Sequence, residues 1–211
     1  MKVAILSESE TDEKAVRILV EGILGHSTEE PERPYPIRTR GWPSVADVAP
    51  KVLRHLHYGT TTEGFVVVVD SNDTPIHRRD RDPPCDVACR LCSVRAALQA
   101  MEGDLTPVPS RARLRVAVGL AIPAIEAWYC SGTQPDISEA AFAADADNFP
   151  SRLTLKRTAY GTHPAPSGRQ VEVAVESARQ LAANLDQLRG AFPAGFGEFF
   201  EEVASWVEDT V

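Results

Sequence analysis

The sequence of 211 residues lacks the features that mark several specialised classes of protein. No apolar run approaches the roughly 18 residues of a membrane helix. The opening MKVAIL is followed at once by Ser7, Glu8 and Glu10, where a secretion signal would continue its apolar segment. Internal repeats and low-complexity segments are absent from the sequence as well. These absences predict a globular protein of the cytoplasm with no membrane partner.

The sequence also lacks phosphate-binding loops and an excess of positive charge. Neither a G-x-x-x-x-G-K loop nor a G-x-G-x-x-G turn is present, and the formal net charge is -8. A protein that binds nucleic acid alone normally presents a basic surface. The arginines here gather only locally, at positions 38 and 40, 78, 79 and 81, and 111, 113 and 115. They fit either a solvated surface or a phosphate contact assisted by a divalent cation and a second subunit.

Cysteine is scarce, with four in the chain, which argues against a disulfide framework in a cytoplasmic protein. Cys85, Cys89 and Cys92 follow the spacing C-x3-C-x2-C, and His77 could complete a zinc site with them. The same cysteines fall at i, i+4 and i+7 of a helical pattern over residues 85–101. We therefore expect a buried stripe on one helix face, with zinc as the alternative.

Strands and helices alternate along the first two thirds of the chain. Apolar segments predict strands at 2–7, 37–40, 64–70 and 113–122, and helical periodicity predicts helices at 13–25, 45–58, 85–101 and 123–132. The strand GFVVVVD has no polar alternation, as is typical of strands buried on both faces in parallel sheets. Two further helices are expected near 170–190 and 196–208. The pattern predicts an α/β sandwich with a mainly parallel sheet and C-terminal helices.

Polar and special residues predict where these helices start and stop. Asp12 is expected to cap the first helix, and Gly25 to end it. Ser44 is expected to cap the second helix, which Pro50 would break or kink. Pro123 suits the first turn of the fourth helix.

Three predicted strands lead into acidic residues, namely Glu8, Asp70 and Glu126. The carboxyl ends of parallel strands meet at one edge of a sheet, where ligand sites form. Carboxylates gathered there repel each other unless a hard cation such as Mg²⁺ lies among them. Each acid also has a simpler explanation, because Glu8 and Glu126 could complement helix dipoles and Asp70 could merely end a strand.

These segments together resemble the Toprim domain, in particular small Toprim-like proteins related to the OLD nucleases. SESETD at 7–12 resembles the acidic first motif, VVVVDSND at 66–73 the Asp-x-Asp motif, and AIPAIEAW at 121–128 a segment after the last core strand. A looser likeness covers LKRTAYG at 155–161. The resemblance implies a Toprim-like Rossmannoid three-layer sandwich over residues 1–131, followed by a helical extension over 132–211 that packs on it.

The resemblance also implies an activity, which is Mg²⁺- or Mn²⁺-dependent cleavage of DNA or RNA by a nuclease or nickase. Glu8 would be general acid/base or metal ligand, Asp70 and the residue at 72 would hold the metal, and Asp12, Glu126 and Lys156 would complete the catalytic set. Such proteins are often encoded beside an ATPase in anti-phage defence loci. The expected partners are therefore nucleic acid and an AAA- or ABC-type ATPase subunit, and assembly of several copies stays open.

The chain departs from the Toprim pattern at one position. Where the family has the second acid of Asp-x-Asp, this chain has Asn72, whose amide oxygen brings no charge to a cation. Asp73 or Glu126 could compensate. Otherwise the domain is a catalytically weakened binding or sensing module that docks on the ATPase. A third alternative is an unrelated metal-dependent phosphohydrolase for a small phosphorylated molecule.

Overall fold

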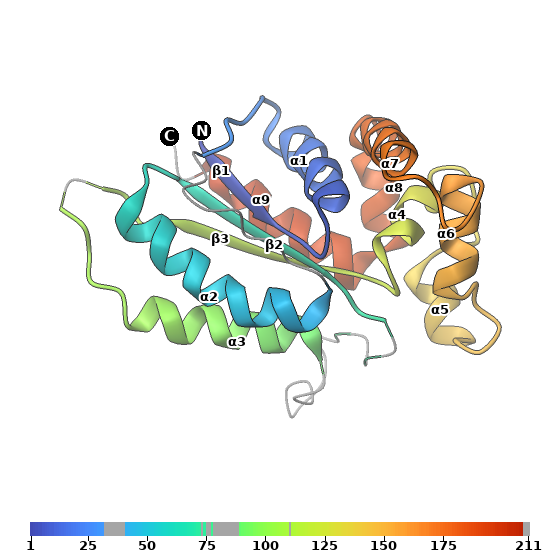
Figure 1. Ribbon diagram of the computed structural model, residues 1–211, viewed down its shortest axis with the longest axis horizontal. Coiled ribbons are helices and arrows are strands. Elements are labelled where there is room, and N and C mark those ends of the chain that lie inside the picture. Colours follow the sequence, from blue (N-terminus) through green and yellow to red (C-terminus); the bar gives the residue numbers. More distant parts are fainter. Residues whose placement is uncertain (32–40, 73, 75–76, 78–88, 110, 209–211) are drawn as a thin grey trace.

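The computed structural model describes residues 1–31, 41–72, 74, 77, 89–109 and 111–208. Its centre is a sheet of the strands β1 (Val3–Leu6), β2 (Gly64–Asp70) and β3 (Arg115–Ala121), in the order β1-β2-β3 and parallel throughout (Figure 1). Three of the predicted strands are thereby confirmed. The fourth, at residues 37–40, lies outside the described residues.

Both faces of the sheet are covered by helices, as the unbroken valine run of β2 predicts. Every residue of β2 is buried, and successive side chains enter different cores. Val66 and Val68 join the core formed with α1 (Glu10–Leu24), α7 (Ser167–Ala182) and α9 (Glu198–Glu208). Phe65, Val67 and Val69 join the core formed with α2 (Trp42–Gly59) and α3 (Arg90–Gly103). Asp70, at the end of this strand, is therefore held by a central and rigid element.

Two helix starts differ from the sequence predictions. Ser9, not Asp12, caps α1, because the Asp12 backbone N–H donates to Ser9 Oγ. Serine three residues before an acid is a capping-box arrangement, which the prediction overlooked. Helix α2 begins after Gly41 rather than at Ser44, since Pro43 has the fixed φ that suits a first turn.

Other helix boundaries agree in part with the predictions. Helix α1 ends at Gly25, whose φ of 72° is easily adopted by glycine, and this prediction is confirmed. Pro50 lies inside α2 without ending it. Helix α4 (Ile125–Ser131) starts after Ala124, so Pro123 precedes the helix instead of occupying its first turn.

The predicted cysteine stripe is confirmed only in part: Cys89 lies in the core formed with α2 and α3, and Cys92 packs against it. Helix α3 begins at Arg90, with Cys89 as the residue that precedes its first turn. Cys89 is buried, whereas Cys92 is partly exposed. Cys85 lies outside the described residues. The cysteines therefore mark the start of a helix, where side chains can converge on a neighbouring loop.

The C-terminal part of the chain is more helical than expected. The segment that reads as loose contains α5 (Glu139–Ala144) and α6 (Arg152–Tyr160), and Figure 1 shows α4, α5 and α6 beyond the end of the sheet. The helices predicted near 170–190 and 196–208 are present as α7 with α8 (Leu185–Ala191) and as α9. Helix α7 packs on α1, and α9 packs on β3. The division at residue 131 stays a prediction.

Glu139 links helix α5 to the turn that precedes α9. Its carboxylate accepts the backbone N–H groups of Ala194 (2.8 Å) and Gly195 (2.6 Å), in the π-helical turn η1 (Pro193–Gly197). Gly195 must be glycine here, because a Cβ would lie 2.2 Å from the carbonyl oxygen of Leu120. No helix among the described residues is both long and apolar enough to cross a membrane.

Candidate active site

The carboxyl ends of β1 and β2 bring Glu8 and Asp70 into contact. The backbone N–H of Asp70 donates to Glu8 Oε1 at 3.1 Å, and the Asp70 side chain accepts the backbone N–H of Ile125 at 3.0 Å. Both acidic side chains are largely buried. We call Glu8, Asp12, Asp70, Asn72 and Glu126 the acidic edge. Its members come from the two strand ends, the first turn of α1 and the first turn of α4.

Arg152 of α6 supplies a cation to the acidic edge. Its Nη2 lies 2.7 Å from Asp70 Oδ2 and 3.9 Å from Glu8 Oε2, and its Nη1 donates to Asn72 Oδ1 at 2.9 Å. Two carboxylates and one amide oxygen thus converge on one guanidinium. The Arg152 side chain keeps 43% of its surface exposed, so the cation lies at the mouth of the edge rather than inside the core.

A second arginine, Arg90, approaches the edge from α3. Its Nη1 donates to the Asp70 carbonyl oxygen at 2.8 Å and lies 3.6 Å from Glu8 Oε1. The guanidinium also stacks over the ring of Trp42, 5.0 Å from its centroid. Arg90 is mostly buried. The start of α3 is therefore tied to both strand ends.

Asn72 reaches Arg152 because the chain turns sharply after β2. Ser71 N–H donates to Ala121 O and Asn72 N–H to Pro123 O, both at 2.8 Å, which extends the pairing of β2 beyond Asp70. Asn72 then has a φ of 48°, a conformation that asparagine tolerates better than most residues. Asp73, the predicted alternative ligand, lies outside the described residues.

Glu126 occupies a separate corner of the acidic edge. Its Oε1 accepts the Tyr160 hydroxyl at 3.2 Å and lies 3.6 Å from Lys156 Nζ. Its Oε2 is buried without a hydrogen-bond partner among the described residues. The hydroxyl of Tyr129 is buried in the same condition. Two such atoms at one edge have hydrogen-bonding capacity that a polar ligand, water or ion could satisfy.

Burial and like charge make the acidic edge hard to ionise fully. Desolvation raises the pKa of Asp70 well above its usual range, and Glu8, Asp12 and Glu126 raise it further. Arg152 acts in the opposite direction. Desolvation also raises the pKa of Asp12 to about 7; the hydrogen bond from Ser9 lowers it, and Glu126 raises it. A cation added to this edge would relieve the repulsion between the carboxylates.

The donor set of the edge fits a hard divalent cation. Carboxylate and amide oxygens are the ligands that Mg²⁺ and Mn²⁺ prefer, and Glu8 Oε2, Asp70 Oδ2 and Asn72 Oδ1 already face one positive group. Among the described residues, however, no three acids of the edge place ligand atoms within 4.8 Å of one another. Arg152 would have to yield part of its place to a metal ion.

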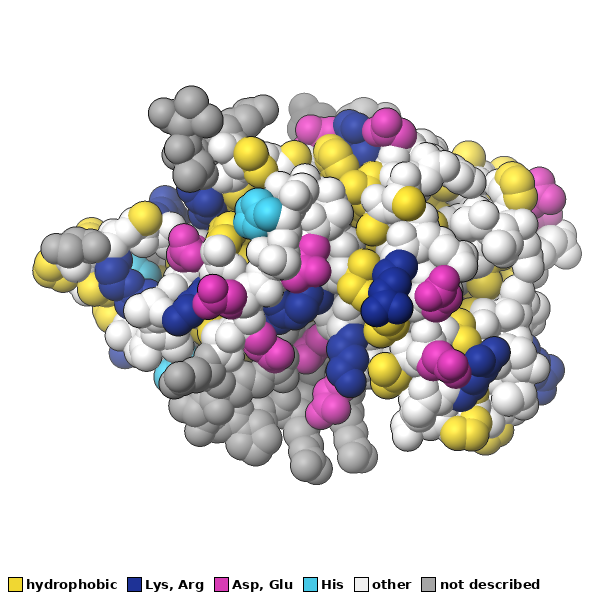
Figure 2. All heavy atoms as spheres, turned by 90° about the horizontal axis from the view of Figure 1, so that it is seen from above, with side chains coloured by type: hydrophobic (Ala, Val, Ile, Leu, Met, Phe, Trp, Pro, Cys, Tyr) yellow, Lys and Arg dark blue, Asp and Glu magenta, His cyan; other side chains and the backbone are white. Residues whose placement is uncertain are grey.

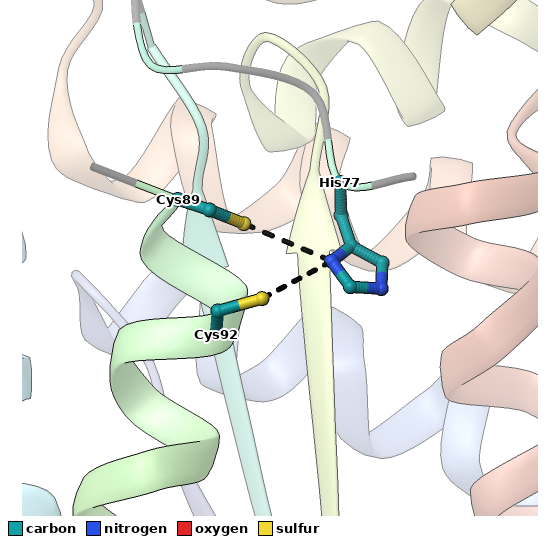
Figure 3. A group of neighbouring side chains, drawn as sticks. All are labelled: His77, Cys89 and Cys92. Carbon is teal, nitrogen blue, oxygen red and sulfur yellow. Dashed lines mark hydrogen bonds between the residues drawn. The ribbon is translucent and has the colours of Figure 1, made fainter. Parts of the chain in front are cut away.

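A different set of ligands lies beside the acidic edge. His77, Cys89 and Cys92, the His–Cys group, place their ligand atoms within 4.8 Å of one another and could hold a metal ion (Figure 3). His77 Nδ1 lies 3.3 Å from Cys92 Sγ and 3.8 Å from Cys89 Sγ. The two cysteines flank Arg90, so this group and the acidic edge share the start of α3.

One cavity lies away from the acidic edge. It has a volume of about 290 Å³, lies at the amino end of β3, and is lined by six apolar residues together with His57, Glu102, Arg111 and Arg113. None of the acidic edge lines it. The candidate site residues therefore lie at the carboxyl edge of the sheet, away from this cavity.

The visible surface charge is mixed. On the face that Figure 2 shows, Lys and Arg side chains are interspersed with Asp and Glu rather than gathered into a basic field.

No protein-family model, no curated protein and no solved structure matches this chain. The Toprim resemblance therefore stays a prediction.

Two contributors to the edge escaped the sequence prediction. Arg152 lies in a segment that reads as loose, although Ser151 caps α6 and could have predicted its start. Arg90 lies within a predicted helix, where nothing in the sequence indicates that it turns towards Asp70. Lys156, predicted as catalytic, contacts Glu126, and among the described residues it forms no ion pair with Glu8 or Asp70.

Proposed function

We propose that the chain is a Toprim-like, Mg²⁺- or Mn²⁺-dependent nuclease or nickase for DNA or RNA, with residues 1–131 as its Toprim-like core. The observation that carries the proposal is the convergence of Glu8, Asp70 and Asn72 on one cationic group at the carboxyl edge of a parallel sheet. Open α/β sheets bind their ligands at this edge.

In this proposal Glu8, Asp70 and Asn72 would hold the metal ion. When bound, Mg²⁺ would offset charge on a phosphate oxygen and lower the pKa of a water nucleophile. Asp12 and Glu126 would lie behind this set, at the corner where Glu126 Oε2 has no partner among the described residues. Glu8 is the candidate general base, because its carboxylate reaches the mouth occupied by Arg152.

The two cationic side chains of α6 would act on the phosphate. Arg152 is 43% exposed and Lys156 is 29% exposed, so both can reach a ligand at the mouth of the edge. A guanidinium that lets go of Asp70 Oδ2 can pair with a phosphate oxygen instead. Arg152 would then contact the substrate, and Glu8, Asp70 and Asn72 would be free to hold a metal ion.

The net charge of -8 supports a partner that supplies positive surface. We propose an ATPase subunit in a cytoplasmic anti-phage complex, with the present chain as its effector. Nucleic acid would then be held mainly by the partner, and this chain would provide the catalytic residues of the acidic edge.

Cleavage assays test the proposal. The protein is incubated with supercoiled plasmid DNA and with tRNA in Mg²⁺ or Mn²⁺, with and without a candidate ATPase. We expect cleavage that falls at least about 100-fold in Glu8→Ala and Asp70→Ala, as for loss of a catalytic acid/base. Asp186→Ala, a change of an exposed acid on α8, is the control and should cleave normally. Full cleavage by both edge variants would show that the site is wrong.

A binding or sensing module is the second candidate, and Arg152 favours it. The guanidinium already pairs with Asp70 and contacts Asn72, so part of the charge of the edge is offset without a metal ion. Stoichiometric co-purification with the ATPase, together with no cleavage under any metal condition, would support this module over the nuclease.

A further inference from the structure

We infer that His77, Cys89 and Cys92 form a zinc site that fastens the chain after β2 to the start of α3. Soft thiolates and imidazole are the ligands of structural zinc, in contrast to the oxygens of the acidic edge. The inference does not depend on the proposed nuclease activity.

The distances within the His–Cys group fit a tetrahedral ion. Zinc bonds of about 2.3 Å to sulfur and about 2.0 Å to nitrogen place neighbouring sulfur and nitrogen ligands roughly 3.6 Å apart. The separations from His77 Nδ1 are 3.3 Å to Cys92 Sγ and 3.8 Å to Cys89 Sγ, on either side of this value. Figure 3 shows both sulfur atoms pointing towards that same ring nitrogen. All three ligand atoms therefore face one point.

The other nitrogen of His77 has the neighbour that a zinc-bound histidine requires. His77 Nε2 lies 3.5 Å from Glu198 Oε1, and Glu198 is buried on α9. A carboxylate beside the far nitrogen keeps the proton there, which leaves Nδ1 with its lone pair for a metal ion. Glu198 is held in turn by Arg95, whose Nη1 lies 3.0 Å from Glu198 Oε2.

The charges of the ligands would balance that of the ion. Two thiolates and a neutral imidazole would cancel the charge of Zn²⁺, and Arg95 pairs with both Glu198 and Glu202 beside them. The thiolates would lie at the start of α3, a helix of 14 residues whose N-terminal dipole favours negative charge. Cys92 is partly exposed, so a metal ion can enter, and a water molecule can occupy the fourth position.

The site would serve the acidic edge indirectly. Arg90 lies between the two cysteine ligands and contacts the Asp70 carbonyl oxygen and Glu8. A metal ion that fixes the first turn of α3 would fix Arg90 with it. His77, Cys89 and Cys92 are accordingly zinc ligands that would hold the start of α3, and Glu198 is a positioning residue.

Metal content tests the site directly. Untagged protein is produced in zinc-supplemented medium, purified under reducing conditions and analysed by mass spectrometry of the elements. We expect about one zinc per chain, as for a single structural site. Cys92→Ser and His77→Ala should lose most of it. Cys130→Ser is the matched control, since the buried Cys130 thiol donates to Leu155 O and should not affect zinc.

Absorption spectra of the cobalt-loaded wild-type protein test the ligand set even if a variant folds poorly. Wild-type protein stripped of zinc and loaded with Co²⁺ should show thiolate charge-transfer absorption and the intense visible bands of tetrahedral cobalt. Cys92→Asp retains a ligand and should bind Co²⁺ with weaker charge-transfer absorption. Glu198→Gln should weaken zinc binding by 10- to 100-fold, on the order seen for outer-shell partners.

Three results would overturn the inference. One is a wild-type chain that stays free of zinc and shows no cobalt bands. Another is equal zinc in Cys92→Ser and Cys130→Ser. The third is a stable disulfide between Cys89 and Cys92 in the metal-free protein under the same reducing conditions.

Discussion

The acidic edge and the His–Cys group lie on either side of Arg90, yet they handle buried charge in different ways. At the edge, four carboxylates are crowded together and answered by exposed cations from a distant helix, Arg152 and Lys156. In the His–Cys group the ligands can be neutral until a metal ion arrives, and the neighbouring Glu198 is already paired with Arg95, which also pairs with Glu202. In the first arrangement the carboxylates repel one another and the pKa values of two of them are raised, as is common at functional sites. The second can gain stability from metal at little electrostatic cost.

The largest expected effect comes from removing zinc. When the free zinc concentration is 100 to 1,000 times the Kd of the site, binding adds about 3–4 kcal/mol to the free energy of unfolding. Stripping the wild-type protein with a soft-metal chelator should lower stability by that amount in urea titrations. The Cys92→Ser protein should not respond to the chelator, and a wild-type protein that is equally indifferent would remove the contrast between the two regions.

Arg152→Ala should break the balance of the acidic edge. It leaves Asp70 buried without its nearest cation, and we expect a loss of about 1–3 kcal/mol, reduced from the value for a fully buried pair because Arg152 is 43% exposed. Added Mg²⁺ should then raise the melting temperature of the variant more than that of the wild type.

Arg179→Ala, on the exposed face of α7, is the control for this experiment. It should neither destabilise the protein appreciably nor change its response to Mg²⁺. If Mg²⁺ acts equally on the wild type, Arg152→Ala and Arg179→Ala, the acidic edge does not bind the ion.

The two regions should respond to pH in opposite directions. At the acidic edge, burial raises the folded-state pKa of Asp12 to about 7. The stability that Asp12 contributes is fully present below pH 4 and is lost as pH rises through about 7. Zinc binding by thiolates instead weakens as pH falls.

Asp12→Asn isolates the acidic edge in this experiment. The change removes a carboxylate whose charged form is disfavoured, so unfolding free energy at pH 8 should rise by about 1–2 kcal/mol, with little change at pH 4. Zinc content should be unaffected at either pH. A variant that is less stable than the wild type at pH 8 would contradict the raised pKa of Asp12.

Lys156→Met should have the smallest effect on stability and a larger one on function. Lys156 is 29% exposed and lies 3.6 Å from Glu126 Oε1, so its loss should cost about 0.5–1 kcal/mol. Cleavage should fall at least about 10-fold if the ammonium group contacts phosphate. Unchanged cleavage would assign Lys156 to the stability of Glu126 alone.

The sequence predicted correctly those features that depend on residues close together in the chain. Four consecutive valines predict a strand buried on both faces, and β2 is such a strand. Acids directly after strands predict a shared edge, because parallel strands end together, and Glu8 contacts Asp70. Glycine at position 25 predicts the end of α1.

The rest depended on contacts between segments distant in the sequence. Arg152 contacts Asp70, which is 82 residues away in the sequence, and Arg95 contacts Glu198, which is 103 residues away. No spacing pattern predicts such pairs. The cysteine spacing misled because i, i+4 and i+7 suit a helix face, whereas α3 starts only at Arg90. Register within the helix was right, but its first residue was not.

The position of α6 in the chain has a consequence for synthesis. Every acid of the edge precedes residue 131, whereas Arg152 and Lys156 follow it. While the protein is being made, the strands can pair before their cations have left the ribosome. Helix α6 therefore brings Arg152 and Lys156 to acids that were synthesised before it. A chain cut at residue 131 would retain the acids and Arg90 but lose both of these cations.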